Sequence, residues 1–128
     1  MNRTISFLAI PLAALTLAAC GGGNDAGSSG GGAVDVRTSS LGRILVDGDG
    51  RTLYLFERDT DGKSTCTGAC AETWPPYRTN GKQVTYDGHP LYYFAGDQKP
   101  GETNGEGLDE FGGAWYVVAP SGQPVDRS

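Results

Sequence analysis

The fold is decided by the stretch Gly50-Arg-Thr-Leu-Tyr-Leu-Phe-Glu-Arg-Asp59, which recurs 38 residues later as Gly88-His-Pro-Leu-Tyr-Tyr-Phe-Ala-Gly-Asp97. Gly, Leu, Tyr, Phe and Asp coincide at five of the ten positions, and a tryptophan follows each copy. Self-similarity at a fixed spacing is typical of an internal structural repeat. The sequence therefore predicts two similar units, the first over about residues 42–79 and the second over about residues 80–121.

A short β-prone run and an Asp-Gly turn precede each copy. In the first copy these are Ile44-Leu-Val46 and Asp47-Gly48, and in the second they are Gln83-Val-Thr-Tyr86 and Asp87-Gly88. Two β-prone runs on either side of Asp-Gly are typical of a β-hairpin. We expect a small all-β domain over residues 37–128, with one short helical turn near residues 66–73 and strands at about 43–47, 51–57, 83–86, 90–95 and 114–119.

Each motif copy is apolar on both faces of its expected strand. Alternation along a strand puts Tyr54 and Phe56 on one face and Leu53 and Leu55 on the other. A strand of this kind lies in the interior, with cover on both sides. We therefore expect the motif tyrosines to belong to the core, with their hydroxyls hydrogen-bonded at its edge.

Asp59 and Asp97 end the two copies, just beyond the expected strands. An Asx turn or a helix N-cap is the ordinary role of aspartate at such a place. The functional alternative has both aspartates and both motif tyrosines, Tyr54 and Tyr92, facing one cleft between two pseudo-symmetric halves.

The two copies of Tyr-x-Phe-x-x-Asp resemble the motif of a bacterial secreted-repeat lipoprotein family, which carries Tyr-x-(Phe/Trp/Tyr)-x-x-Asp in tandem behind a lipoprotein signal. The matching residues are Tyr54, Phe56, Asp59, Tyr92, Phe94 and Asp97. The resemblance extends to Ser64-Thr-Cys66, to Cys70-Ala-x-x-Trp74-Pro-Pro76 and to Gly112-Gly-Ala-Trp115. It implies a membrane-anchored, extracytoplasmic, β-rich domain, and it implies no particular reaction.

The first twenty residues have the pattern of a lipoprotein signal. The apolar run from Ile5 to Leu17 is too short to span a bilayer as a helix, but it has the length of a signal-peptide core. Leu17-Ala-Ala-Cys20 resembles the lipobox of bacterial lipoproteins, in which the cysteine is lipidated and becomes the first mature residue. We expect residues 1–19 to be removed and Cys20 to anchor the chain to the membrane. The alternative is an ordinary secreted protein with Cys20 as a free thiol.

Residues 20–36 are expected to join the anchor to the domain as a tether. Seven of the fifteen residues from Gly21 to Asp35 are glycine, which loses the most entropy on ordering and has no side chain to bury. A flexible tether of this length has a root-mean-square reach of about 20–25 Å. The expected location is extracytoplasmic, and Gly21 after the lipidated cysteine resembles the signal for delivery to an outer membrane where the host has one.

The charge balance and the single histidine exclude two classes of function. The 128 residues carry 10 basic and 15 acidic side chains, and no Lys/Arg run occurs, which argues against nucleic acid as a partner. A single histidine, His89, excludes a multi-histidine metal centre. The expected partners are the membrane, through the lipid on Cys20, and an envelope protein or small ligand.

Cys66-Thr-Gly-Ala-Cys70 is the segment with reactive chemistry, and it has three interpretations. A disulfide is favoured by an oxidising compartment and by the turn-forming Gly68. Two thiolates and the imidazole of His89 form a sensible ligand set for Cu(I), and CxxxC with a distant histidine resembles the copper chaperones of cytochrome oxidase assembly. A thiol–disulfide exchanger is the third interpretation, although CxxC is the usual spacing there.

The sequence contains no nucleophile elbow, phosphate-binding glycine loop, HExxH or catalytic-triad order. We therefore expect a non-enzymatic, lipid-anchored envelope protein without a cofactor, acting as a binding or structural module. The alternative is a periplasmic redox or copper-handling protein that uses Cys66, Cys70 and His89.

Overall fold

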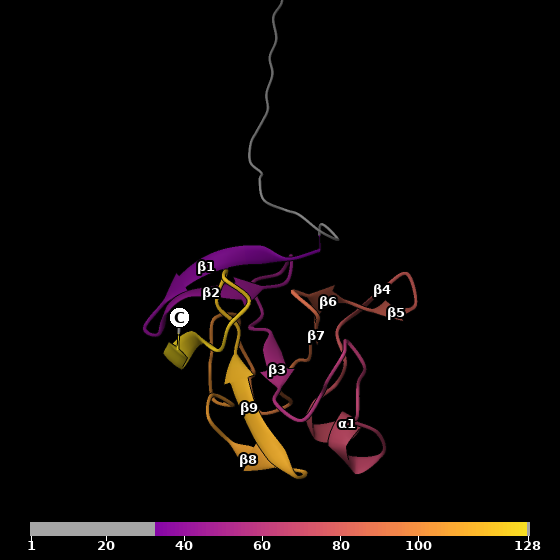
Figure 1. Cartoon of the computed structure of the whole chain (residues 1–128). Coiled ribbons are helices and arrows are strands. Elements are labelled where there is room, and N and C mark those ends of the chain that lie inside the picture. The colour runs from indigo at the N-terminus through magenta and orange to yellow at the C-terminus, as the bar shows by residue number, and fades with distance from the viewer. Residues whose placement is uncertain (1–32, 128) are drawn as a thin grey trace, which may run out of the picture.

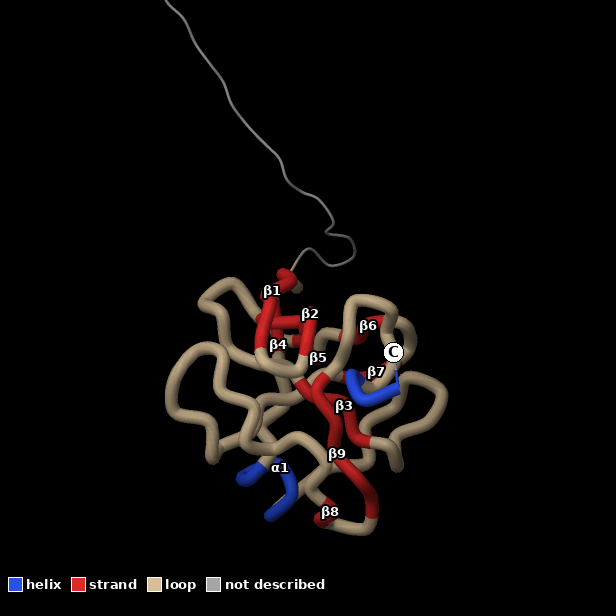
Figure 2. Tube along the Cα trace, turned by 90° about the vertical axis from the view of Figure 1, so that its left-hand side faces the viewer, coloured by secondary structure: helices blue, strands red, loops and turns tan. Residues whose placement is uncertain are grey.

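The computed structural model describes residues 33–127, so the expected signal peptide, Cys20 and most of the expected tether lie outside the described residues. Short strands joined by long loops make up most of the described chain (Figure 2). In chain order the elements are β1 (Asp35–Ser39), β2 (Gly42–Val46), β3 (Tyr54–Phe56), α1 (Ala69–Thr73), β4 (Arg78–Thr79), β5 (Lys82–Gln83), β6 (Thr85–Tyr86), β7 (His89–Pro90), β8 (Asp109–Glu110), β9 (Gly113–Val117) and a 3-10 helix (Val125–Arg127) (Figure 1). The domain is mainly β, as the sequence predicts.

The Asp-Gly turns reverse the chain at the two expected places. Asp87 and Gly88 both have positive φ, at 51° and 83°, and join β6 to β7. This is the backbone that a two-residue hairpin turn of the primed type requires. In the first repeat, the amide of Asp47 donates to the carbonyl oxygen of Arg51 at 2.9 Å, and Val46 bridges Thr52 beyond the turn. The hairpin prediction is confirmed in both repeats.

Strand β1 is an element that the sequence analysis did not predict. It pairs with β2 in antiparallel register, with Asp35 opposite Val46 and Ser39 opposite Gly42. Ala33 and Val34, just before it, pack against the core. The folded domain therefore includes residues 33–36, which we had placed in the tether.

The centre of the molecule is an antiparallel sheet, in the order β3, β9, β8, that bridges extend beyond β3 and that joins the two repeats. β3 pairs with β9, with Leu55 opposite Tyr116. On its other edge, Tyr54 exchanges two backbone hydrogen bonds with Tyr92, at 2.8 and 2.9 Å. The segment around Tyr92 in turn pairs with the segment around Pro76. The strand order is therefore β8, β9, β3, residues 91–95, residues 73–77.

In this order, the motif strand of each repeat pairs with a strand of the other repeat. The motif strand of the first repeat, β3, pairs with β9, which belongs to the second repeat. The motif strand of the second repeat pairs with residues 73–77 of the first: Tyr93 donates to the carbonyl of Pro75 and Ala95 donates to that of Thr73, both at 2.8 Å. Both repeats therefore depend on each other for backbone pairing.

The central strands bury both faces, as their apolar pattern predicts. Tyr54 and Phe56 belong to one core cluster, whereas Leu53 and Leu55 belong to a second cluster on the opposite face. All four side chains are at most 2% exposed. The prediction that the motif strand lies in the interior is confirmed.

Helix α1, the one α-helix among residues 33–127, lies within the expected residues 66–73, and its C-cap Trp74 stands immediately before two prolines. Proline cannot continue a helix, because it lacks the backbone N–H and clashes with the preceding turn. Within residues 33–127, no helix combines the length and apolar character needed to cross a bilayer.

Candidate functional site

The motif tyrosines and aspartates meet at the interface between the repeats, and they pair across it. The hydroxyl of Tyr54 donates to Oδ2 of Asp97 at 2.6 Å. The hydroxyl of Tyr92 donates to Oδ2 of Asp59 at the same distance. Each repeat therefore supplies the tyrosine of one pair and the aspartate of the other. A charge-assisted O–H···O⁻ bond of this length is among the stronger hydrogen bonds in proteins.

The second carboxylate oxygen of each aspartate holds the loop that follows it. Oδ1 of Asp59 accepts from the amide and the hydroxyl of Thr65, both at 2.7 Å. Oδ1 of Asp97 accepts from the amide of Asn104 at 2.9 Å. Both aspartates are buried, at 8% and 5% exposed. They therefore neither cap a helix nor close an Asx turn, and the expectation of that ordinary role was wrong.

Each tyrosine hydroxyl also accepts a hydrogen bond from its surroundings. The amide of Gly105 donates to the hydroxyl of Tyr54 at 3.1 Å, and the hydroxyl of Ser64 lies 2.6 Å from that of Tyr92. A side chain at Gly105 would not fit, because an added Cβ would lie 2.7 Å from the indole of Trp74 and 3.0 Å from the ring of Tyr54. The loop comes this close to the rings because residue 105 is glycine.

Four aromatic rings form a continuous stack beneath the two hydroxyl pairs. The indoles of Trp74 and Trp115 lie 4.0 Å apart, centroid to centroid, and are parallel to within 4°. Phe56 stacks on the outer face of Trp115 at 3.9 Å, and Phe94 stacks on that of Trp74 at 4.4 Å. The partners again come from opposite repeats, so the stack has the same pseudo-symmetry as the sheet.

The tyrosine rings meet this stack edge-on. Tyr54 lies 5.3 Å from Trp74, and Tyr92 lies 5.0 Å from Trp115. Both indole N–H groups are satisfied at one residue: Trp74 donates to the carboxylate of Glu110 at 3.1 Å and Trp115 donates to its carbonyl oxygen at 3.0 Å. Offset, parallel and edge-to-face contacts add stabilisation beyond the area that the rings bury.

Burial raises the pKa of both motif tyrosines and of Asp97. Burial first, and then the hydrogen bond to Asp97, raises the pKa of Tyr54 far above its ordinary value near 10. Burial and the hydrogen bond to Asp59 raise the pKa of Tyr92 in the same way. Burial also raises the pKa of Asp97, although the hydrogen bonds from Tyr54 and Asn104 oppose that shift. The phenols are therefore protonated throughout the physiological range.

Cys66 and Cys70 form a disulfide, with their Cα atoms 5.2 Å apart. Both are buried, and they belong to the same core cluster as the tryptophan stack. The disulfide interpretation is confirmed. Sulfur atoms joined in this way do not act as the pair of thiolates that the copper interpretation requires.

His89, the third residue of that copper set, lies half-buried in β7. Among residues 33–127, no group of three or more His, Cys, Asp or Glu side chains is close enough together to hold a metal ion. Copper binding stays a prediction that metal analysis can test.

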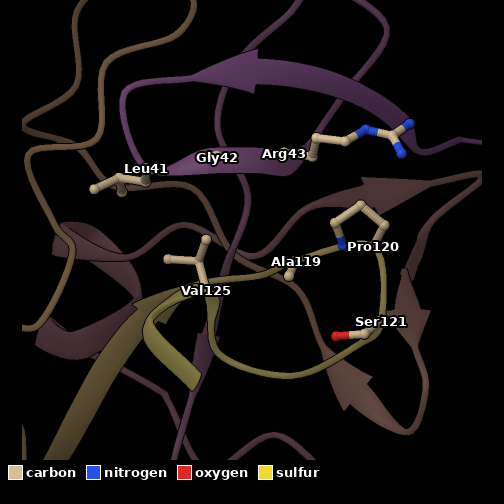
Figure 3. Close-up of a pocket in the computed structure, with 7 residues that line it drawn as sticks. All are labelled: Leu41, Gly42, Arg43, Ala119, Pro120, Ser121 and Val125. Carbon is tan, nitrogen blue, oxygen red and sulfur yellow. The ribbon is translucent and has the colours of Figure 1, made fainter. Parts of the chain in front are cut away.

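The motif does not line an open cleft. An open hollow of about 410 Å³ lies elsewhere, between the β1–β2 turn and the C-terminal segment (Figure 3). Its lining residues are Leu41, Gly42, Arg43, Ala119, Pro120, Ser121 and Val125. None of the six motif residues is among them. The motif tyrosines and aspartates are at most 8% exposed, so within residues 33–127 they do not face an open cleft.

Residues 35–78 and 77–119 each match the model of a family described as a secreted repeat of unknown function. The chain belongs to this family. The match confirms the resemblance inferred from the tandem motif, and the family's secreted character supports an extracytoplasmic location. No curated protein and no solved structure matches the chain. The first family repeat begins at residue 35, before the boundary near residue 42 that we expected, and so takes in the β1–β2 hairpin.

Several residues that build the interface lie outside the repeated stretch, and among them only Thr65 falls in a segment that the family resemblance covers. Thr65, Asn104, Gly105 and Glu110 all bond to motif aspartates, motif tyrosines or the indoles. Glu110 lies in β8 and the other three lie in loops, all outside the repeated ten-residue stretch, and their types differ between the repeats. Only the reciprocal pairing shows why the secreted repeat occurs here in tandem.

Proposed function

We propose that the mature protein is a lipid-anchored, extracytoplasmic module with a structural or binding role rather than an enzymatic one. One observation carries the proposal of a non-enzymatic role: the polar groups of the family motif are used within the core. The Tyr54 and Tyr92 side chains are 0% exposed, and each hydroxyl is held by the other repeat's aspartate. Groups paired in this way stabilise the domain, and a substrate does not reach them.

The anchor is supported by the lipobox Leu17-Ala-Ala-Cys20 directly after an apolar core. The Cys66–Cys70 disulfide fits the oxidising compartment that such a signal leads to. A lipid on Cys20 with the glycine-rich segment after it would hold the domain near the membrane surface.

Membrane fractionation of Cys20→Ala tests the anchor. The wild-type chain should partition with membranes after a high-salt wash and incorporate labelled fatty acid, whereas Cys20→Ala should do neither. Cys66→Ala/Cys70→Ala is the matched control, because it removes two cysteines and should leave partitioning unchanged. Processed Cys20→Ala protein that still sediments with washed membranes would contradict the lipid anchor.

Nitration of the folded protein tests the role of the motif. Tyr54 and Tyr92 should react far more slowly with tetranitromethane than Tyr86 and Tyr116, which are half-buried at the surface. Peptide mass spectrometry identifies the nitrated residues. Motif tyrosines that react as fast as the other two would place them in an accessible site and overturn the structural role.

A further inference from the structure

The aromatic core has the geometry of an electron-transfer unit. Trp74 and Trp115 overlap face to face at 4.0 Å, and Phe56 and Phe94 extend the stack on both sides. Ring systems in such contact share a positive charge more readily than an isolated ring, because the electron density of each stabilises the vacancy in the other. Hydrophobic packing alone is equally satisfied by edge-to-face pairs.

A proton acceptor stands beside each tyrosine that touches this stack. Removal of an electron from a phenol is favourable only when its proton leaves at the same time. Tyr54 and Tyr92 each have a carboxylate oxygen at 2.6 Å, within the reach that direct proton transfer needs. Tyr93 has the same contact with Asp47 at 2.6 Å, but it packs against the other core cluster, away from the stack. Tyr77 and Tyr86 donate at this distance to backbone carbonyls, which do not take up a proton.

The aspartates are arranged to receive that proton. Both carboxylate oxygens of Asp97 accept hydrogen bonds, from Tyr54 and from Asn104. Both oxygens of Asp59 likewise accept, from Tyr92 and from Thr65. A carboxyl group that accepts hydrogen bonds on both oxygens and donates none is in its ionised form, which can take up a proton. The raised pKa of both phenols keeps the proton on the tyrosine until an electron is lost.

We propose that this core is a one-electron redox site, which reduces oxygen-centred radicals reaching the domain in its oxidising compartment. The radical gains one electron from the Trp74–Trp115 pair. Tyr54 or Tyr92 then returns one electron to the indole pair, while its phenolic proton moves to Asp97 or Asp59. One tyrosine becomes a neutral phenoxyl radical, one aspartate becomes a neutral carboxylic acid, and the oxidant is reduced by one electron.

The burial of these groups leaves one route for the electron, at the rim of the stack, and keeps water away from the radical. The electron leaves the stack at its rim, where Phe94 and Glu110 are half-exposed and contact Trp74. Both indoles and both motif tyrosines are 0% exposed, so water and other solutes do not contact the resulting radical. Exclusion of water protects reactive intermediates from side reactions. The redox site lies within the folded domain and does not depend on the lipid anchor.

Flash oxidation of the mature protein tests the proposal. Visible light and a sacrificial acceptor generate tris(bipyridine)ruthenium(III), which removes one electron without exciting tryptophan or the disulfide. We expect a tryptophan radical that decays into a tyrosyl radical, followed by transient absorption and identified by freeze-quench electron paramagnetic resonance. In deuterated water the tyrosyl radical should form more slowly, because the proton moves with the electron.

Three variants assign the radical. Tyr54→Phe/Tyr92→Phe should lose the tyrosyl signal and lengthen the life of the tryptophan radical. Tyr86→Phe, the matched control, removes a hydroxyl with a carbonyl partner and should leave both signals unchanged. Asp59→Asn/Asp97→Asn should abolish tyrosyl formation while the indoles still oxidise.

Circular dichroism establishes that each variant is folded. Where a double variant does not fold, the single variants Tyr54→Phe and Tyr92→Phe should each lose part of the tyrosyl signal. A wild-type protein that forms no tyrosyl radical would overturn the proposal. So would a tyrosyl signal that depends on Tyr86, or a rate of tyrosyl formation that is equal in light and deuterated water.

Discussion

Tyr54 and Tyr92 each combine a ring that fills the core with a hydroxyl that joins the two repeats. The ring of Tyr54 packs against Trp74 and Phe94, and its hydroxyl reaches Asp97. The loss of the whole side chain therefore has a larger cost than the loss of the hydroxyl. The two contributions can be separated by substitution.

Truncation of either tyrosine to alanine should lower the free energy of unfolding by about 3–5 kcal/mol, the usual range for a buried aromatic side chain. Tyr54→Phe and Tyr92→Phe should each lose about 1–3 kcal/mol, because the ring stays while a buried carboxylate oxygen loses its donor. Urea denaturation measures both. Tyr86→Phe, whose hydroxyl donates to the carbonyl of Pro120, is the control and should lose about 1 kcal/mol. Equal losses for the alanine and phenylalanine variants would contradict this role of the ring.

A double-mutant cycle tests whether the tyrosine–aspartate contacts cross the repeat boundary. Tyr54→Phe combined with Asp97→Asn should show a coupling energy of about 0.5–3 kcal/mol, as expected for direct partners. Tyr54→Phe combined with Asp59→Asn pairs residues of one repeat, and the two changes should add to within about 0.5 kcal/mol. Denaturation of the four variants of each cycle provides the comparison. Stronger coupling within a repeat than across the boundary would contradict the reciprocal arrangement.

Alkaline pH should unfold the protein through the same tyrosines. Burial raises the pKa of Tyr54 and Tyr92 in the folded state above the value near 10 that they have when unfolded. Above pH 10 the unfolded chain therefore loses protons that the folded chain keeps, so stability falls as pH rises. Each tyrosine whose ionisation the folded state suppresses should lower the free energy of unfolding by about 1.4 kcal/mol per pH unit in that range.

Denaturation at pH 9 to 12 in urea measures this dependence. Tyr54→Phe/Tyr92→Phe should show a flatter profile above pH 10, because it lacks both groups. Tyr93 and Tyr77, whose pKa burial also raises, account for the dependence that stays in the variant. A variant profile as steep as that of the wild type would assign the alkaline loss of stability to other residues.

At the scale of elements, the disulfide loop that leads into α1 can be tested against the copper interpretation. Closing a five-residue loop contributes about 2 kcal/mol by the chain-entropy estimate, so Cys66→Ala/Cys70→Ala should fold with a loss of that size. Protein purified from the envelope should resist alkylation until it is reduced, and His89→Ala should change stability by less than about 0.5 kcal/mol. Intact-mass measurement and metal analysis check these outcomes. One equivalent of tightly bound copper, lost in His89→Ala, would contradict the disulfide as the native state.

The sequence predicted local elements better than the pairing between them. The Asp-Gly hairpins, the two apolar faces of β3 and the short helix before Pro75 follow from turn chemistry, alternation and the properties of proline, which act within a few residues. Strand β1, by contrast, has a largely exposed and polar sequence, and it is a strand because β2 pairs with it.

The candidate site was predicted only in part, for the same reason. The repeated stretch correctly indicated that Tyr54, Phe56 and Tyr92 form the core, whereas Phe94 is half-exposed and packs against it. It did not indicate that Tyr54 pairs with Asp97 instead of its own repeat's Asp59, because both choices share one spacing pattern. The parallel contact of Trp74 and Trp115 likewise depends on the packing of the two halves, which no single segment specifies.

At the scale of the whole molecule, the two repeats form one folding unit. β3 lies between β9 and residues 91–95, both from the second repeat, and residues 91–95 lie between β3 and residues 73–77, both from the first. A repeat on its own would leave the backbone groups of residues 54–56 or 92–95 without their strand partners, and both faces of its tryptophan uncovered. Unpaired buried backbone groups are costly, so a single repeat should not be stable.

Fragments divided at the exposed turn between Asn80 and Gly81 test this dependence. Residues 33–80 and 81–127 should each lack a cooperative unfolding transition. Neither fragment contains the strand that pairs with residues 54–56 or 92–95 of its own motif, nor the aspartate that pairs with its motif tyrosine. Mixed in equal amounts, they should associate and recover the near-ultraviolet circular dichroism that the packed tryptophans give. The matched control carries Asp97→Asn in the second fragment, which removes one acceptor for Tyr54 and should weaken the association. If either fragment folds cooperatively alone, the exchange of strands is not what holds the domain together, and each secreted repeat is an independent unit.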